Sequence, residues 1–424
     1  MPHSRVLLAA LLLLLITATS LTAQYPQDPK TIPEYAPVEA VWIEWNFDPA
    51  TWHIYSPLID EIQAVAKAYL LVPDSLHEAY LQGLLINDSI PLQNIVFFRT
   101  PTERIWIRDH GPITVTDAAT LAFLDFDDFA NSGIDEDLPT RLAQLLGIDS
   151  YEIDLIFDGG NIMVDNYNNL FCTKRLYTRN PNLTQDSIKQ ILHAYMGIDS
   201  VHALCALAND YWGHIDMQMK LLDDTTVVIS HYDPYHPSHD STESNFQYVQ
   251  SLVNPLGGSY RIERLPTSGA LKNYANSLIV NDKIIIPTYD HPNDSIALQI
   301  YQVLKPDHQI ASINCSTIIA WEGAIHCITM QHPYYPTAIL ERESSTFQRL
   351  FLAPNPTRYT LVIESDNPAG KIRIINKLGA VVMESETHDR TTVLNIESLN
   401  QGIYFLLLED HSGSAAFKSF IKLD

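Results

Sequence analysis

Short apolar runs alternate with amphipathic stretches along most of the chain, which is the pattern of an α/β protein. Val41–Trp45 predicts a strand, and Leu58–Ala68 has helical periodicity. Pro57 is expected near the first turn of that helix, where a proline costs no hydrogen bond. The next expected elements are a strand at Ala68–Val72, a helix at Leu76–Leu85 and a strand at Ile95–Phe98.

The middle of the chain repeats one order of elements: a strand, a helix and a second strand. The last three units recur at about 57 residues, a period that indicates a modular or propeller-like repeat. With the N-terminal elements they predict roughly five units, although coincidental spacing in an unrelated α/β fold stays an alternative. The opening strands are expected at Leu121–Phe126, Leu170–Thr173, Thr226–Ser230 and Lys283–Pro287. The helices are expected at Pro139–Leu146, Thr184–Tyr195, Glu243–Val253 and Asp294–Leu304, and the closing strands at Tyr151–Ile156, Val201–Leu204, Tyr260–Leu265 and Gln309–Ile313.

The alternation of strand and helix patterns ends after Pro336. Residues 341–351 are mostly polar and predict a linker, and residues 352–424 contain short strand patterns separated by turn signals. This pattern favours a small all-β sandwich appended to the main domain. The expected strands are Tyr359–Glu364, Lys371–Asn376, Ala380–Glu384, Thr392–Ile396, Ile403–Glu409 and Ala416–Lys422.

The first residues have the pattern of an export signal. Arg5 precedes an apolar stretch, and small residues end at Ala23, which is typical of a secretory signal peptide over residues 1–23. We expect the main domain to occupy residues 24–340 and the protein to lack a transmembrane anchor, because no other long apolar run follows.

The net charge limits the classes of molecule that the protein is expected to bind. The chain of 424 residues carries 50 acidic and 26 basic side chains, a formal charge of −24. Such a surface repels nucleic acids and anionic lipids and attracts cations, although a role in solubility alone stays open. Four cysteines are too few to staple a domain of this size, and Cys172, Cys205 and Cys315 could pair or stay free.

Four short segments hold most of the reactive groups. Their sequences are Trp106-Ile107-Arg108-Asp109-His110-Gly111-Pro112, Asp158-Gly159-Gly160-Asn161, Tyr211-Trp212-Gly213-His214-Ile215-Asp216 and Glu322-Gly323-Ala324-Ile325-His326-Cys327. His214 and Asp216 are two residues apart, so in a strand they would face one space. A surface pair and a metal site are the alternatives, although a metal site would want a third nitrogen or sulfur ligand with readable spacing.

Each remaining segment also has an ordinary explanation. Cys327 lies in an apolar run, where a cysteine is most often inert, but Gly323 just before it permits close approach of a substrate. Asp109 is expected at a strand-to-turn junction, where an acidic residue is most simply a turn former. Asp158-Gly159-Gly160 is most simply a tight turn. No segment decides the function alone.

Taken in order, these segments resemble the guanidine-modifying deiminases of the pentein superfamily, in particular agmatine deiminases and bacterial peptidylarginine deiminases. The resemblance spans roughly residues 35 to 335 and includes Tyr274-Ala275-Asn276-Ser277. It implies a five-bladed αβ-propeller, with no metal and no organic cofactor. It also implies Cys327 as nucleophile, His214 as acid/base, and Asp109 and Asp216 as carboxylates that bind the guanidinium. Trp106, Tyr211 and Asn276 match substrate-binding positions.

The substrate is less well defined. The resemblance implies either a small cationic guanidinium compound, such as agmatine, or the arginine side chains of proteins. Bacterial peptidylarginine deiminases carry arginines after the first carboxylate, whereas here the segment Asp125–Gly133 is acidic and Arg141 is the first arginine to follow Asp109. The lack of arginines in this acidic segment favours agmatine as the substrate. A secreted binding protein that keeps the fold but has lost the chemistry is a further alternative.

The C-terminal segment has its own resemblance. Ala353-Pro354-Asn355-Pro356, Leu378-Gly379 and Gly402-Ile403-Tyr404 are similar to a type IX secretion sorting domain. This implies contact with the type IX machinery and a location outside the cell or on its surface. A papain-like protease is disfavoured, because its cysteine would precede the histidine, whereas His214 precedes Cys327.

Overall fold

The computed structural model describes residues 25–45, 48–118, 120–130, 133–269, 271–335, 350–365, 370–376, 381–410 and 415–423. The chain divides into two compact units, one that ends at Tyr335 and one that follows it. The expected signal peptide and the polar stretch from 341 to 349 lie outside the described residues.

Five small sheets make up the described part of the first unit. Four of them share one plan, in which an antiparallel hairpin is followed by a helix and by a third strand parallel to the second. In chain order these modules are β4 (Ile113–Asp117), β5 (Thr120–Asp127), α5 (Leu138–Leu146) and β6 (Asp149–Ile156); β7 (Met163–Val164), β8 (Asn169–Thr173), α6 (Arg175–Arg179), α7 (Gln185–Met196) and β9 (Ser200–Leu204); β10 (Met219–Leu221), β11 (Thr226–Ser230), α8 (His239–Ser251) and β12 (Arg261–Leu265); and β13 (Leu278–Val280), β14 (Lys283–Thr288), α9 (Asn293–Leu304) and β15 (Gln309–Asn314).

The fifth sheet joins the two ends of the unit. Its order is β16 (Met330–Pro333), β1 (Val38–Glu44), β2 (Lys67–Val72) and β3 (Ile95–Arg99). The β16–β1 pair is antiparallel and the other pairs are parallel, so β16 takes the place of the first hairpin strand in the N-terminal module. Helices α2 (Trp52–Gln63) and α3 (Ser75–Asn87) connect its parallel strands.

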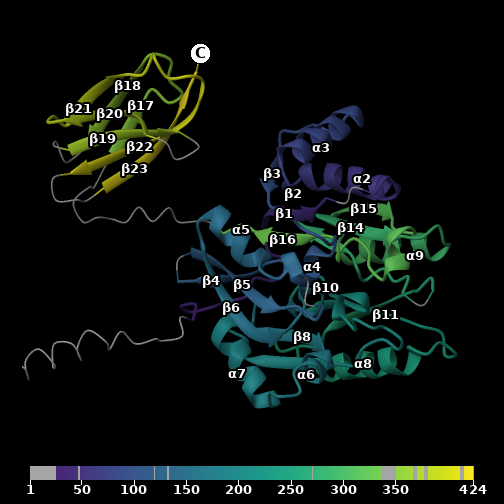
Figure 1. Ribbon diagram of the computed structural model, residues 1–424. Helices are drawn as coiled ribbons and strands as arrows, with labels where there is room; N and C mark the ends of the chain where they lie inside the picture. The colour runs from purple at the N-terminus through teal and green to yellow at the C-terminus, as the bar shows by residue number, and fades with distance from the viewer. Residues whose placement is uncertain are drawn as a thin grey trace, which may run out of the picture. The chain divides into compact units, whose positions relative to one another are not determined.

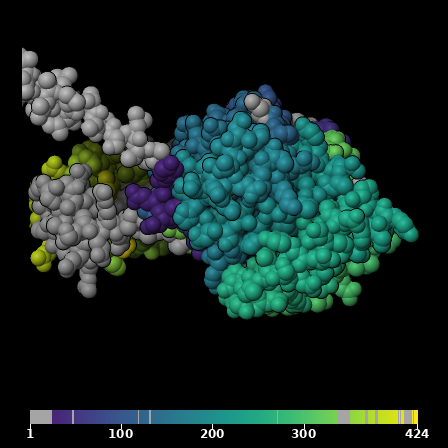
Figure 2. All heavy atoms as spheres, turned by 90° about the horizontal axis from the view of Figure 1, so that it is seen from below, coloured from purple at the N-terminus to yellow at the C-terminus, as the bar shows by residue number. Residues whose placement is uncertain are grey.

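Figure 1 shows α2, α5, α7, α8 and α9 at the periphery of this unit, with α4 (Ile107–His110) and β10 nearer its middle. In the space-filling view, modules that follow one another in sequence lie side by side and pack without a break (Figure 2). The second strand of each module is almost fully buried. In β11, for example, all five residues are buried. Strands covered on both faces read as continuous apolar runs, which is why the sequence shows them clearly.

The predicted strands and helices between residues 121 and 313 are confirmed to within a few residues. The sequence did not reveal the first strand of each hairpin, because these strands are two to five residues long, too short for a periodic signal.

The helix expected at Leu58–Ala68 begins earlier than predicted. It spans Trp52–Gln63 and holds Pro57 in its interior rather than in its first turn. An internal proline costs a helix about 3 kcal/mol. The helix buries one face through Ile54, Leu58 and Ile62, a spacing of four residues that keeps these side chains on the same side. Burial of that face outweighs the cost of the proline.

The second unit has two sheets in its described part. One has the order β17 (Leu350–Ala353), β18 (Thr360–Ser365) and β21 (Thr391–Asn395). The other has the order β20 (Val381–Thr387), β19 (Gly370–Asn376), β22 (Gly402–Asp410) and β23 (Ala415–Lys422). Leu361, Ile372 and Leu406 belong to one core, to which both sheets contribute. Leu350 and Phe351, expected in the linker, already belong to β17.

Candidate active site

The candidate site residues share one place in the repeating plan. Each lies in the segment that leads into the first strand of a hairpin. Asp109 precedes β4, Asp158 precedes β7, His214 and Asp216 precede β10, Asn276 precedes β13, and Cys327 precedes β16. The repeat therefore brings together side chains that are more than two hundred residues apart in sequence.

Two of these segments differ in local structure from the prediction. His214-Ile215-Asp216 is not a strand: His214 caps a 3₁₀ helix at Ile215–Met217. Asp109 lies in the short helix α4, not at a strand-to-turn junction. Asp158 precedes a 3₁₀ turn at Gly159–Asn161, which agrees with the tight turn that was expected. Because the segments are compact turns, several side chains and backbone groups converge within a few residues.

Cys327 is buried and its thiol has two polar side-chain neighbours. Its Sγ lies 3.2 Å from Asn276 Nδ2 and 3.7 Å from Asp216 Oδ2. Asn276 Oδ1 also accepts the backbone N–H groups of His326 and Cys327 at 3.1 and 3.4 Å, so this amide holds the whole turn. Burial, Asp216 and Asp109 raise the pKa of the Cys327 thiol well above its usual range. The thiol is therefore protonated until positive charge arrives.

His214 is held by carboxylates from two other segments. Its Nε2 lies 2.8 Å from Asp158 Oδ2 and its Nδ1 lies 3.4 Å from Asp109 Oδ1. Arg179 forms an ion pair with Asp158 and so fixes that carboxylate. Burial alone would lower the pKa of His214, but Asp109 and Asp158 raise it to about 9. His214 therefore carries a proton at neutral pH and is able to donate it.

Asp109 and Asp216 each have one carboxylate oxygen that accepts no hydrogen bond. These atoms, Asp109 Oδ1 and Asp216 Oδ1, are buried and have no hydrogen-bond partner among the described residues, although Asp109 Oδ1 lies in the 3.4 Å ion pair with His214 Nδ1. Unpartnered buried carboxylate oxygens are costly unless a ligand supplies donors. Burial raises the pKa of Asp109, with Asp158 and Asp216 adding to the effect, while His326 holds the pKa of buried Asp216 below its usual range. The arrangement suits a planar cation with several N–H groups.

Of the other expected substrate-binding residues, Trp106 and Gly323 lie against each other. A Cβ on Gly323 would come within 2.3 Å of the Trp106 ring, so only glycine fits there. Tyr211 lies at the surface with 63% of its area exposed, and its ring centroid is 5.6 Å from that of Phe129 and 5.3 Å from that of Trp212. Trp212 in turn lies 6.2 Å from His214, so Tyr211 belongs to an aromatic rim rather than to the interior.

The acidic stretch after Asp109 is mostly engaged within the protein. Asp125 accepts a 2.6 Å hydrogen bond from Thr140, and Asp128 accepts one of 2.6 Å from Arg104. Both aspartates are buried and do not face solvent. Asp128 Oδ1 has no hydrogen-bond partner among the described residues.

Sequence reasoning missed several residues of the site. Asp158 was taken for a turn former, and Arg179, Glu34 and His326 were given no role. His326 Nδ1 lies 2.6 Å from Asp216 Oδ2, and its Nε2 lies 2.6 Å from Glu34 Oε1. Lys220, fully buried in the apolar run of β10, forms an ion pair with Glu34. A lysine inside a buried strand was the signal that could have revealed this network.

One further group resembles a metal site. Ligand atoms of Glu44, His110 and Asp135 lie within 4.8 Å of one another. Arg104 already supplies positive charge there, since its guanidinium lies 3.1 Å from His110 Nδ1 and 3.6 Å from Asp135. His110 Nε2 lies 2.8 Å from Glu44. These contacts explain the group as a buried cluster of ion pairs and hydrogen bonds around His110 of α4.

Comparison with known proteins identifies the family to which the first unit is similar. Residues 30–333 match the Porphyromonas-type peptidyl-arginine deiminase family. The chain belongs to this family. The family hydrolyses a C–N bond of a guanidinium group, so the protein is a hydrolase of the deiminase class.

Relatives of this deiminase differ in the substrates they are named for. It is 26% identical over 346 residues to the agmatine deiminase of Pseudomonas syringae, an alignment that covers 71% of this chain and 94% of that protein. It is 27% identical over 370 residues to a Shewanella protein provisionally named agmatine deiminase, with coverages of 75% and 98%. A Porphyromonas gingivalis structure, provisionally named arginine deiminase, matches at 26% identity and a TM-score of 0.64 over 72% of this chain and 98% of that one.

The agmatine deiminase of Enterococcus faecalis has the same fold, with a TM-score of 0.66 and 20% identity over 74% of this chain and 98% of that one. Residues 352–422 match the secretion system C-terminal sorting domain, which indicates type IX secretion to the cell surface or beyond. Among the described residues, no helix has the length and apolar character to span a bilayer.

Proposed function

We propose that this deiminase converts agmatine to N-carbamoylputrescine and ammonia through a covalent intermediate on Cys327. The observation that carries the proposal is the convergence of a buried thiol, a protonated imidazole and two carboxylates, each with a buried oxygen that accepts no hydrogen bond from the described residues. Asp109 and Asp216 bind the N–H groups of the guanidinium and hold its plane, which leaves the central carbon open to Cys327 Sγ.

The first half of the reaction forms the intermediate. The bound cation offsets the negative charge of Asp109 and Asp216, so the Cys327 thiol loses its proton to water as the substrate enters. The thiolate attacks the guanidinium carbon and forms a C–S bond. His214 gives its proton to the departing nitrogen, and the C–N bond breaks to release ammonia.

The second half hydrolyses the intermediate. His214, now neutral, takes a proton from a water molecule, and the resulting hydroxide attacks the carbon. The C–S bond breaks, the proton on the new oxygen passes to the departing Cys327 thiolate, and the neutral ureido product leaves. The reacting group stays cationic, so carboxylates stabilise it where an acyl-transfer enzyme would need an oxyanion hole.

Three observations favour agmatine over free arginine and over a peptide that ends in arginine. The relatives named above include agmatine deiminases, the net charge of −24 attracts a dication, and the arginines next to the acidic stretch are engaged. Arg104 binds Asp128, and Arg141 binds Asp137, Thr100 and two backbone carbonyls. Neither is free to bind the carboxylate of an arginine substrate.

Protein arginine is the second candidate, and a specific observation favours it. The sorting domain indicates export, and an exported enzyme meets protein surfaces. The exposed aromatic rim of Tyr211 and Phe129 would accept a peptide backbone. We further propose that the five modules close as an αβ-propeller, that the second unit is a β-sandwich, and that residues 1–23 are a signal peptide.

A side-by-side assay for ureido product separates the substrates. Agmatine, free arginine and a peptide with an internal arginine are supplied to the full chain, and to Cys327→Ala and Cys205→Ser variants. We expect product from agmatine in the wild type and in Cys205→Ser, whose thiol contacts Lys174 and not a residue proposed for the chemistry, and none in Cys327→Ala. Product from the peptide alone would replace agmatine by protein arginine. No product from any substrate would leave a non-catalytic binding protein.

A further inference from the structure

The histidine next to the nucleophile is buried between two carboxylates. His326 has no exposed surface, and its two ring nitrogens lie 2.6 Å from Asp216 Oδ2 and 2.6 Å from Glu34 Oε1. Carboxylate oxygens only accept, so both contacts are hydrogen bonds when both ring nitrogens carry protons. The ring is then a fixed cation that bridges the N-terminal segment and the candidate site.

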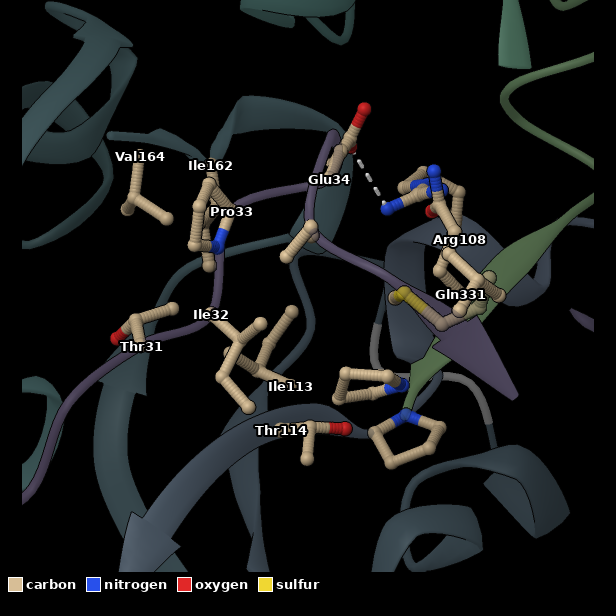
Figure 3. Close-up of a pocket in the computed structure, with 16 residues that line it drawn as sticks. Thr31, Ile32, Pro33, Glu34, Arg108, Ile113, Thr114, Ile162, Val164 and Gln331 are labelled. Atoms are coloured by element: carbon tan, nitrogen blue, oxygen red, sulfur yellow. Dashed lines mark hydrogen bonds and ion pairs between the residues drawn. The ribbon is translucent and has the colours of Figure 1, made fainter. Parts of the chain in front are cut away.

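The far end of this bridge is itself fixed. Glu34 forms an ion pair with buried Lys220 and lies 3.1 Å from Arg108 Nη1, a contact drawn in Figure 3. Arg108 also donates to Gln331 at 2.5 Å and to the His326 carbonyl at 3.3 Å. Figure 3 shows Glu34 and Arg108 at one end of a cavity of about 50 Å³ whose wall includes Thr31, Ile32 and Pro33 of the same N-terminal segment.

Such a network is poorly explained by stability. Taking several charges out of water costs free energy that their mutual attraction barely returns, and apolar side chains of similar volume often serve as well. A buried network of this kind is better explained by the orientation that it imposes on a functional group.

The group that it orients is Asp216. Its Oδ2 accepts the His326 proton and also lies 3.7 Å from Cys327 Sγ, whereas its Oδ1 has no partner among the described residues. The bridge therefore fixes which oxygen of Asp216 is left for a substrate, and it places positive charge beside the oxygen that faces the thiol.

We propose that Glu34 is a positioning residue that acts through His326 to orient Asp216 beside Cys327. This inference rests on the proposed deimination at Cys327. Glu34 touches neither the thiol nor the oxygens that would bind substrate. Its effect is transmitted by two short charge-assisted hydrogen bonds, the strongest class of hydrogen bond in proteins.

The first test compares Glu34→Gln with Tyr35→Phe. The Tyr35 hydroxyl donates to Asp224 at 2.5 Å and anchors the same segment without touching His326. We expect Glu34→Gln to lower kcat/KM for agmatine about 10-fold to 100-fold, mainly through a higher KM, because a charged hydrogen bond is lost. Tyr35→Phe should stay within about twofold of wild type. Equal losses in both variants would show that Glu34 only anchors the segment.

A double-mutant cycle tests the route of transmission. Asparagine at position 326 places an amide N–H near the former Nδ1 position, so His326→Asn keeps a donor for Asp216 but loses the contact with Glu34. If Glu34 acts through His326, then adding Glu34→Gln to His326→Asn changes kcat/KM by less than about twofold. Losses that multiply would overturn the proposal. Melting temperatures by circular dichroism identify any variant that is simply unfolded.

A readout that needs no substrate separates this proposal from the proposed function. Without the bridge, less positive charge offsets Asp216, so its Oδ2 accepts the Cys327 S–H hydrogen bond more strongly and the thiol is harder to ionise. Iodoacetamide should therefore alkylate Cys327 at least about threefold more slowly in Glu34→Gln than in wild type at one pH. Peptide mass spectrometry resolves Cys327 from the other thiols. If no substrate is turned over but this difference appears, the function fails and the positioning stands. If substrate is turned over and neither alkylation nor kcat/KM changes, the positioning fails alone.

Discussion

His214 shows how the site controls a proton. The buried imidazole would ordinarily favour its neutral form, but carboxylates on two sides hold the pKa of His214 at about 9. Asp158 makes the closer contact, 2.8 Å, and is tied to Arg179. Asp158 therefore fixes the ring orientation of His214, and together with Asp109 it favours the charged form of the ring.

This arrangement predicts the pH dependence of kcat/KM, which reports on the free enzyme. His214 donates a proton to the leaving nitrogen, so activity should fall as pH rises through about 9 and that proton is lost. On the acid side, activity should fall as Asp109 becomes protonated, above the usual carboxyl range because burial raises its pKa. A pH profile with agmatine measures both limbs.

The Asp158→Asn variant tests the cause of the alkaline limb. Removing one negative neighbour lowers the pKa of His214, so the fall in kcat/KM should move to lower pH, and the maximum should drop about 10-fold or more as the ring loses its anchor. Asp186→Asn, on the exposed first turn of α7, is the matched control and should leave the limb in place. An unchanged limb in Asp158→Asn would assign it to another group.

A substitution at Gly160 gives a further prediction at the scale of single residues. A Cβ there would come within 2.5 Å of His214 Nδ1 and 2.9 Å of Asp109 Oδ1. Gly160→Ala should therefore displace the acid/base and lower kcat by about 100-fold, since small misplacements of reacting groups are costly. Gly83→Ala in α3 is the control, because nothing lies within 4 Å of its Cβ. The control should stabilise the protein by up to about 1 kcal/mol and keep full activity.

At the scale of elements, each site residue lies just before the first strand of a hairpin, while α2, α5, α7, α8 and α9 form the outer layer. Helices of the outer layer should therefore affect stability without affecting chemistry. The N-cap of α7 is an example: Thr184 accepts a 3.1 Å hydrogen bond from the Ser187 backbone N–H.

Thr184→Ala removes this cap and should lower the free energy of unfolding by about 1 kcal/mol. Chemical denaturation measures that change, and kcat/KM for agmatine should be the same as in wild type. Gln185→Ala, one residue further on, is the control and should change stability by less than about 0.5 kcal/mol. A fall in activity with Thr184→Ala would show that α7 does influence the site.

The elements also show where local signals mislead. A two-residue spacing placed His214 and Asp216 on one face of a strand, yet the segment is a 3₁₀ turn. Pro57 was expected near a helix start but lies inside α2. In both cases tertiary contacts decided: a cluster of buried charges surrounds the turn, and an apolar face supports the helix.

At the scale of the whole molecule, the site lies in the first unit and the sorting match lies in the second. Deleting residues 350–424 should therefore leave kcat/KM for agmatine within about twofold of wild type, because each unit has a hydrophobic core of its own. In a host with type IX machinery, the same deletion should keep the enzyme inside the cells. Activity assays and immunoblots of medium and cells measure the two outcomes, and export of the truncated chain would contradict the role of the tail.

The sequence by itself determined the α/β order of elements, the repeat, the strand-rich C-terminal segment and most of the reactive residues. These follow from apolar periodicity and from short motifs, which are local properties of the chain. The pairing of Asp158 with His214 and the bridge from Glu34 through His326 to Asp216 were decided only by the tertiary structure. Glu34 and His326 are 292 residues apart, and no local pattern records a hydrogen bond between such distant segments.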